Sequence, residues 1–322
     1  MTFTLLHGCC QIETCAADLD VSRGFLVDFL GGVPAEQELA RQISELIPGD
    51  DYDVDHVDCG QAIFQINRPS PSMTWQGNPS VHQRYLNERG PCVTNLNYFV
   101  DDIEHARELL STLGAETLIE GPSTSARALA EYGADNTRPG GAARPFLFMG
   151  TRHLIGFDLE IMEPNFVHFS MQDAQFPAYV QPRPGGNGQG FRLTRLIVAV
   201  PDLDRLQANL AAIFSPASVS RPYCRREASD GRSLRLWLGG IELEYVERTG
   251  DICSPAPDET GVFAIAFACE STENVVAQCR QAGIETQELT SDMIGLPSGG
   301  GAWILASRGR VGFDVVLERE TD

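Results

Sequence analysis

The stretch Leu193–Asp204, LTRLIVAVPDLD, joins an apolar run to a turn built from a proline and two aspartates. The run predicts a buried strand, and an aspartate in the turn offers side-chain oxygens to the first free amides of a helix. The residues that follow, LQANLAAIF, carry apolar side chains at helical spacing. A strand, an acidic turn and an amphipathic helix therefore follow one another here.

The same order recurs three more times in the chain. It is found in CQIETCAADLDVSRGFLVDFLGG at 10–32, NLNYFVDDIEHARELLSTLGAE at 95–116 and AIAFACESTENVVAQCRQAGIE at 264–285. Each of the four segments is followed by an apolar strand with a charged or proline exit: AIFQINRP at 62–69, FDLEIMEP at 157–164, IELEYVER at 241–248 and FDVVLERE at 313–320. The recurrence predicts a βαβββ module used four times.

The segment 165–190 separates the second module from the third. It is rich in Pro, Gly and Gln and has no sustained periodicity, so we predict a linker. The expected domains are therefore an N-terminal pair of modules over 1–164 and a C-terminal pair over 191–322, in an α+β protein.

Charge and composition exclude several functions. The net charge of −20 would repel nucleic acid and anionic membrane surfaces. Every basic residue is arginine, so there is no lysine for a pyridoxal phosphate Schiff base or a nucleotide-binding P-loop. No signal peptide or membrane-length apolar run is evident, and the nine cysteines lack regular CxxC pairing. We expect a cytoplasmic protein with reduced thiols.

The repeated unit, with VPDLD after its first strand, resembles the vicinal oxygen chelate superfamily of glyoxalases, epimerases, fosfomycin-type resistance proteins and extradiol dioxygenases. The resemblance covers nearly the whole chain and implies two tandem barrel-like mixed sheets. It also implies that metal or substrate is held by residues of the first and last strands of each module. Because many chemistries share this scaffold, the resemblance alone does not indicate the reaction.

Aligning the modules on their turns and exits gives one inner position for each first and last strand. In the first half these are Gln11, Gln65, Asn95 and Glu160, and in the second half Arg195, Glu244, Ala264 and Val316. Arg195 and Glu244 predict a charge pair, whereas Ala264 and Val316 offer a metal no donor atoms. No histidine follows His168, which excludes the two-histidine, one-glutamate iron site that extradiol dioxygenases carry in the second half. We therefore predict an active first half and a degenerate second half.

Glu160 is the predicted catalytic residue of the first half, as a general base or a metal ligand. Asp158 lies two residues away on the same strand face, where mutual repulsion would raise one carboxyl pKa. The predicted substrate-binding residues are Gln11, Gln65, Asn95, Asn97, Asp158 and His153. If a metal binds, the predicted ligands are Gln11, Gln65, Asn95 and Glu160, whose oxygens favour Mg²⁺, Mn²⁺ or Ca²⁺ over zinc. His56 and His82, assigned to loops or a helix surface, receive no chemistry.

The leading functional hypothesis is an enzyme that moves a proton on a small oxygenated substrate, with aromatic-derived compounds among the candidates, as an isomerase, lyase or glyoxalase-like protein. One alternative is a ring-cleaving dioxygenase with an atypical metal site, in which the divalent metal would be iron. The other is a non-catalytic binding or resistance protein. A small molecule is the expected partner, and a homodimer is compatible with the resemblance.

Overall fold

The structure is a computed structural model that describes residues 2–34, 52–59, 62–69, 74–75, 78–120, 147–162, 191–228, 231–248, 260–289 and 301–320. The predicted linker at 165–190 lies outside these residues, so the domain boundaries stay a prediction. None of the helices in the described ranges is long and apolar enough to cross a membrane.

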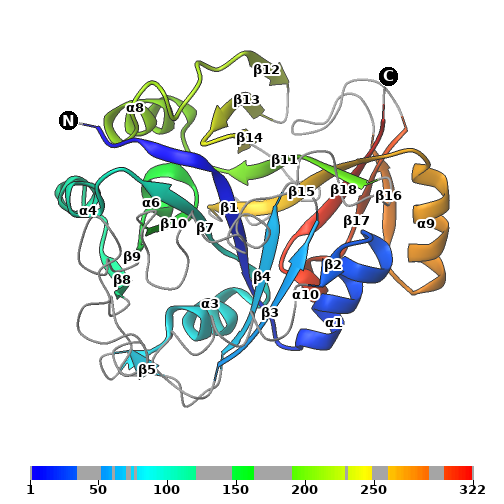
Figure 1. Ribbon diagram of the computed structural model, residues 1–322. Helices are drawn as coiled ribbons and strands as arrows, with labels where there is room; N and C mark the ends of the chain where they lie inside the picture. Colours follow the sequence, from blue (N-terminus) through cyan, green and yellow to red (C-terminus); the bar gives the residue numbers. More distant parts are fainter. Residues whose placement is uncertain are drawn as a thin grey trace.

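The first half contains two strand-rich modules, and two short strands and a helix lie between them in the chain (Figure 1). The first module consists of β1 (Leu5–Cys15), α1 (Leu19–Gly24) with the π-helical turn η1 (Phe25–Phe29), β2 (Val33–Pro34), β3 (Tyr52–Asp58) and β4 (Ile63–Pro69). The short strands β5 (Thr74–Trp75) and β6 (Asn78–Pro79) and helix α3 (Val81–Arg89) follow. The second module consists of β7 (Cys92–Val100), α4 (Ile103–Thr112), β8 (Thr117–Glu120), β9 (Leu147–Met149), the short helix α6 (Arg152–Ile155) and β10 (Asp158–Met162).

The second half repeats this order. Its first module consists of β11 (Phe191–Ala199), α8 (Leu203–Ile213), β12 (Cys224–Ala228), β13 (Gly231–Leu238) and β14 (Ile241–Arg248). Its second module consists of β15 (Gly261–Cys269), α9 (Thr272–Gln281), β16 (Thr286–Leu289), β17 (Ala302–Leu305), the short helix α10 (Arg308–Val311) and β18 (Asp314–Arg319).

Each half forms one mixed eight-stranded sheet, and the two sheets have the same strand order. The first runs β2-β3-β4-β1-β7-β10-β9-β8 and the second β12-β13-β14-β11-β15-β18-β17-β16. In both, the first strands of the two modules pair antiparallel at the centre, and each first strand pairs parallel with the last strand of its own module. The predicted four βαβββ modules in two barrel-like sheets are confirmed, and neither sheet closes on itself.

Local sequence chemistry explains where the module helices begin. The side chains of Asp18, Asp102 and Asp202 accept hydrogen bonds from backbone amides of the first turns of α1, α4 and α8. The neighbouring Asp101 instead accepts from the backbone amide of Thr4. In these three modules the capping aspartate lies immediately before the helix, and it fixes the residue at which the helix begins.

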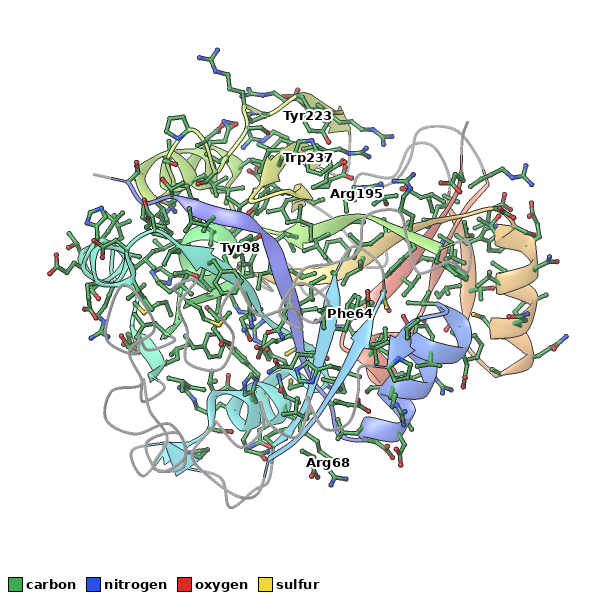
Figure 2. All side chains as sticks on the ribbon, in the orientation of Figure 1. Phe64, Arg68, Tyr98, Arg195, Tyr223 and Trp237 are labelled. Atoms are coloured by element: carbon green, nitrogen blue, oxygen red, sulfur yellow. The ribbon has the colours of Figure 1, made fainter. Side chains whose placement is uncertain are left out.

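One apolar core includes residues of both halves, so the halves are packed against each other. Phe64 of β4 stacks on Phe313, with ring centroids 5.4 Å apart. Tyr98 of β7 is fully buried and donates a hydrogen bond from its hydroxyl to the carbonyl of Leu238, 3.4 Å away. Figure 2 labels Phe64 and Tyr98 in the first half and Arg195 in the second.

Candidate functional site

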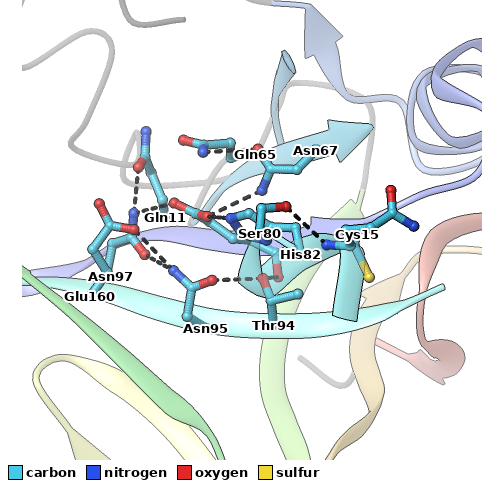
Figure 3. Close-up of polar contacts among 12 residues, drawn as sticks. Gln11, Cys15, Gln65, Asn67, Ser80, His82, Thr94, Asn95, Asn97 and Glu160 are labelled. Carbon is cyan, nitrogen blue, oxygen red and sulfur yellow. Dashed lines mark hydrogen bonds and ion pairs between the residues drawn. The ribbon is translucent and has the colours of Figure 1, made fainter. Parts of the chain in front are cut away.

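A cluster of buried polar side chains lies on the central strands of the first sheet (Figure 3). Its members are Gln11 and Glu13 from β1, His56 from β3, Gln65 and Asn67 from β4, Asn95 and Asn97 from β7, and Glu160 from β10. The strand register brings them together: Glu13 is paired with Gln65 on one side and Asn95 on the other, and Asn97 is paired with both Gln11 and Glu160. Four of these residues are the predicted inner positions.

Glu13 is the more enclosed of the two carboxyl side chains in the cluster, with 2% of its surface exposed. The side-chain amide of Asn97 donates to its Oε1 at 2.7 Å, and that of Asn67 donates to its Oε2 at 3.1 Å. His82 of α3 places Nε2 3.8 Å from the same Oε2. Two amide donors therefore compensate part of the cost of burying this carboxylate.

Glu160 shares the cluster with Glu13 and forms a carboxyl pair with it. Burial, repulsion from Glu13 and a hydrogen bond to Glu13 together hold the pKa of Glu160 well above its ordinary value. Burial also raises the pKa of Glu13, but the amides and the hydrogen bond from Glu160 oppose that rise. Two neighbouring carboxyls cannot both ionise readily, and the larger rise makes Glu160 the member of the pair that keeps a proton longer as pH increases.

The amide side chains form a directed chain of hydrogen bonds around the pair. Thr94 Oγ1 donates to Asn95 Oδ1 at 2.6 Å, Asn95 Nδ2 donates to Asn97 Oδ1 at 2.7 Å, and Asn97 Nδ2 also reaches Gln11 Oε1 at 2.7 Å. Asn95 Nδ2 further contacts Glu160 Oε2 at 3.2 Å. The result is that amide N–H groups, rather than oxygens, are aimed at the two carboxyls.

Two neutral histidines border the cluster. His56 Nε2 lies 3.1 Å from Gln65 Oε1, and Gln65 Nε2 donates in turn to Asn67 Oδ1 at 3.1 Å. Burial lowers the pKa of His56 to about 4 and that of His82 to about 3. Both rings are therefore uncharged at neutral pH, and the His56 ring orients the amides that reach Glu13.

A β-bulge adds Thr94 to the site. The register between β1 and β7 shifts between Glu13 and Thr14, so that Thr94 is the extra residue. Its hydroxyl contacts the backbone carbonyl of Glu13 at 3.3 Å as well as the side chain of Asn95. Bulges commonly re-aim side chains next to functional sites, and this one turns Thr94 toward the cluster.

The second sheet pairs its strands in the same register, but different side chains fill the equivalent interior positions. Ile197 is paired with Glu244 and Ala264, as Glu13 is with Gln65 and Asn95, and Ala266 is paired with Val316, as Asn97 is with Glu160. The first-half carboxyls and asparagines are thus replaced by Ile197, Val246, Ala264, Ala266 and Val316, which belong to one buried apolar cluster.

The predicted charge pair of the second half is confirmed. Arg195 Nε contacts Glu244 Oε2 at 2.7 Å, and both side chains are almost fully buried. Arg235 Nε reaches the same oxygen at 3.0 Å, and Arg195 Nη1 contacts Glu318 Oε1 at 2.5 Å. The polar part of this half is therefore a compensated set of two arginines and two glutamates, which leaves no free carboxyl pair there.

Two predicted binding residues do not join the cluster. Asp158 accepts hydrogen bonds from the backbone amide of Arg152, at 2.8 Å, and from the hydroxyl of Tyr85. Its register equivalent Asp314 likewise accepts from the amide of Arg308 at 3.1 Å. The shared motif, TRHLIGFD at 151–158 and SRGRVGFD at 307–314, indicates that this aspartate holds the short helix before the last strand.

His153 is the other residue that lies elsewhere. It is exposed on α6, near Gly114. Its position close to a strand end suggested the mouth of the site, but His153 lies exposed on the short helix α6. We therefore do not retain Asp158 and His153 as substrate-binding residues.

The sequence reasoning gave no role to five residues of the site: Glu13, Asn67, Thr94, His56 and His82. Glu13 and Asn67 each lie two residues after a predicted inner position, and strand alternation places Glu13 on the same strand face as Gln11. His56 lies on β3, a strand that could not be placed from the sequence, and His82 is brought in by α3 within an irregular segment. The carboxyl that neighbours Glu160 is therefore Glu13, not Asp158.

Comparison with known proteins shows the fold. No protein-family model and no curated protein matches the sequence. A mutant of 4-hydroxymandelate synthase from Streptomyces coelicolor is similar in structure, with a TM-score of 0.57, 16% identity, and coverage of 98% of this chain and 93% of that one. Homoprotocatechuate 2,3-dioxygenase from Arthrobacter globiformis has a TM-score of 0.50 and 14% identity, covering 99% and 81%. The Mn(II)-bound glyoxalase from Novosphingobium aromaticivorans has a TM-score of 0.50 and 10% identity, covering 99% and 84%.

These similarities confirm the vicinal oxygen chelate fold that the sequence resembles. The similar proteins are enzymes of that superfamily, and one of them binds Mn(II), so a divalent metal is compatible with the fold. At these sequence identities the structural similarity shows the fold and does not indicate a particular reaction.

The side chains as they are arranged do not fit a metal ion. Within the described ranges no three His, Cys, Asp or Glu side chains are grouped to hold one. The amide nitrogens of Asn67, Asn95 and Asn97 point at the carboxyls, and the oxygens of Asn95 and Asn97 already accept hydrogen bonds. A cation needs converging oxygen lone pairs, whereas the amides of this site turn N–H donors toward the carboxyls. The oxygens of Gln11, Gln65 and Asn95 in the predicted metal set are engaged in hydrogen bonds within the protein.

Proposed function

We propose that this protein is an enzyme that transfers a proton on a small oxygenated substrate bound at the first-half cluster. The observation that carries the proposal is the Glu13–Glu160 pair, in which an enclosed and a half-buried carboxyl with raised pKa values are contacted by amide donors. A pair of carboxyls whose pKa values are pushed apart supplies an acid and a base at neutral pH. Isomerisation, enolisation and lyase or glyoxalase-like steps all need this pair of functions.

The two carboxyls have different parts in the proposal. Glu160 is half-buried, so it is the member that a substrate can reach, whereas Glu13 is enclosed. Glu160 would give its proton to a substrate oxygen or, after passing it to Glu13, take one from carbon. Glu13 would carry the negative charge of the pair, which is stabilised by the hydrogen bonds that Glu13 accepts from the side-chain amides of Asn67 and Asn97.

The amides bind and orient in this scheme. Gln11 lies beside the pair on β1, and an N–H group of its amide suits a carbonyl or hydroxyl oxygen of a ligand. Asn95 lies on the neighbouring strand, and its Nδ2 already donates to Asn97 Oδ1 and Glu160 Oε2, so Asn95 orients Glu160. Buried amides cost about 1 to 3 kcal/mol each when unpaired, so a site this polar suits a ligand that is polar itself. Gln11→Ala is therefore expected to weaken binding more than turnover.

The test is proton exchange with solvent, because it needs no knowledge of the natural product. The protein is incubated in D₂O with a panel of small hydroxyketones and other carbonyl compounds bearing an acidic C–H, and deuterium uptake is followed by NMR. A compound that exchanges should lose at least about 100-fold in rate with Glu160→Gln, and a similar factor with Glu13→Gln. Glu273→Gln, at an exposed ion pair, is the matched control and should change nothing.

Unchanged exchange in both site variants would contradict the proposal. Compounds that bind at the cluster without exchange would instead support the binding-protein alternative. The ring-cleaving alternative is favoured only by the dioxygenases among the similar structures. It requires a stoichiometric metal in the purified protein and oxygen uptake with a catechol, and both are directly measurable.

A further inference from the structure

Two cysteines face each other at one end of the strand pair that carries the cluster. Cys15, the last residue of β1, is paired in register with Cys92, the first residue of β7. Their sulfur atoms are 3.5 Å apart and both side chains are buried. Figure 3 labels Cys15 beside the polar cluster.

The backbone geometry at this position suits a disulfide. Residues directly opposite in an antiparallel pair have Cα atoms about 4.5 to 5.5 Å apart, within the range of about 4.4 to 6.8 Å that disulfides span. The sulfurs must approach from 3.5 Å to about 2.05 Å, which side-chain rotation supplies without strand movement. The pair is therefore positioned for bond formation as it stands.

The surroundings of the two thiols differ in a way that suits oxidation. The pKa of Cys92 is lowered by its hydrogen bond with Cys15 and by the positive charges of Arg152, Arg89 and Arg308. The pKa of Cys15 is raised by the same hydrogen bond and by burial. Cys92 is thus the more nucleophilic sulfur and Cys15 the resolving thiol, because the thiolate is the reactive form.

The other buried cysteines do not share this environment. Burial raises the pKa of Cys59, and raises the pKa of Cys269 and of Cys279 to about 11. In the second sheet the register equivalents of the pair are Ala199 and Gly261, so the repeat does not require thiols there. The pairing is a feature of the first half.

We propose that Cys15 and Cys92 are a redox-responsive dithiol that hydrogen peroxide converts reversibly into a disulfide. The Cys92 thiolate attacks one peroxide oxygen, the O–O bond breaks, and sulfenic acid forms at Cys92 with release of hydroxide. Cys15 then attacks the Cys92 sulfur, the S–O bond breaks, and water leaves with the thiol proton. Two thiols and one peroxide thereby give one disulfide and two waters.

The position of the pair connects it to the candidate site, although the proposal does not depend on the function proposed for that site. Cys15 lies two residues after Glu13 and therefore on the same face of β1. Cys92 begins the strand that carries Asn95 and Asn97. A bond between them would link covalently the strand that holds Glu13 to the strand that holds its amide donor Asn97.

The experiment is peptide mapping of the intact protein after treatment with hydrogen peroxide and alkylation of the remaining thiols. Because the chain contains no lysine, trypsin releases Cys15 within peptide 1–23 and Cys92 within peptide 90–107. We expect a cross-linked species of the two peptides, 2 Da lighter than their sum, that disappears on reduction with dithiothreitol. Fragmentation locates the bond, since Cys9 and Cys10 lie in the same peptide as Cys15.

Three substitutions complete the test. Cys15→Ser and Cys92→Ser should each abolish the cross-link, whereas the matched control Cys279→Ser, at a buried cysteine of the second half, should retain it. The proposal is overturned if wild-type Cys92 stays reduced, or if it is oxidised to sulfinic acid without cross-linking. It is also overturned if the two peptides remain cross-linked in Cys15→Ser, because Cys9 or Cys10 would then be the partner.

Discussion

Within the described residues the two halves of this chain carry eight strands each, in the same order and register, yet five equivalent interior positions differ in polarity. Positions held by Glu13, Asn67, Asn95, Asn97 and Glu160 in the first sheet are held by Ile197, Val246, Ala264, Ala266 and Val316 in the second. The second half shows that this scaffold accepts an apolar filling. The polar filling of the first half is therefore not a requirement of the fold.

The difference is informative because burying polar side chains costs free energy. Burying amides and carboxyls requires that each be hydrogen-bonded, and two adjacent carboxyls add repulsion. The first half meets these requirements with a chain of amide hydrogen bonds, whereas the second half avoids most of them. A region that accepts such costs where an equivalent region does not is the better place for a function.

The largest expected effect comes from moving a first-half carboxyl into the second half. Val316→Glu would place a carboxyl among apolar side chains, opposite Ala266, and should lower the free energy of unfolding at pH 7 by at least about 3 kcal/mol. Urea denaturation measures this. The reverse exchange, Glu160→Val, should cost less than about 1 kcal/mol, and equal losses for the two variants would erase the distinction between the halves.

His56 gives the first half a pH dependence that its register equivalent Arg235 cannot give. Its folded pKa of about 4 lies below the unfolded value of 6.5, so the unfolded state binds protons first on acidification. Stability from this group is complete above about pH 6.5 and is lost as pH falls toward 4, by roughly 3 kcal/mol in all. His56→Gln should make the urea denaturation midpoint depend less on pH across this window. If the midpoint falls with acidification as steeply as in the wild type, His56 is not a buried neutral ring.

The carboxyl pair predicts the opposite slope at higher pH. The folded pKa of Glu160 is raised, so its contribution is complete below the unfolded value of about 4.5 and is lost as pH rises through the folded value. Glu160→Gln should therefore gain stability over wild type as pH rises, by about 1.4 kcal/mol for each unit of the shift. Thermal or urea denaturation of both proteins from pH 4 to pH 9 measures it, and a constant difference would reject the pair.

A smaller effect tests whether Asp158 is structural in both halves. Asp158 and its register equivalent Asp314 each accept a hydrogen bond from a backbone amide of a short helix. Asp158→Asn and Asp314→Asn should each weaken that bond and lower the free energy of unfolding by about 1 kcal/mol. Urea denaturation measures both, and neither should change the rate of deuterium exchange. A selective loss of exchange in Asp158→Asn would return this residue to the site.

The sequence predicts the repeat well because an apolar first strand, a polar turn, an amphipathic helix and an apolar last strand with a charged or proline exit recur in every module, with an aspartate cap in three of the four. The four inner positions of each half follow from that repeat, and the strand register confirms that they correspond. The rest depends on contacts that spacing does not reveal. The bulge that brings in Thr94, the α3 helix that brings His82 to Glu13, and the short helix that diverts Asp158 are all set by tertiary packing.

The most direct test of the central claim is a pH titration of the two site carboxyls by NMR, with ¹³C-labelled glutamate and the variants Glu13→Gln and Glu160→Gln to assign the resonances. We predict that one carboxyl of the wild-type pair keeps its proton well above the ordinary glutamate range, and that Glu13→Gln moves the pKa of Glu160 downward. Two independent titrations near pH 4.5 in the wild type, unaffected by either substitution, would contradict a shared proton at this site.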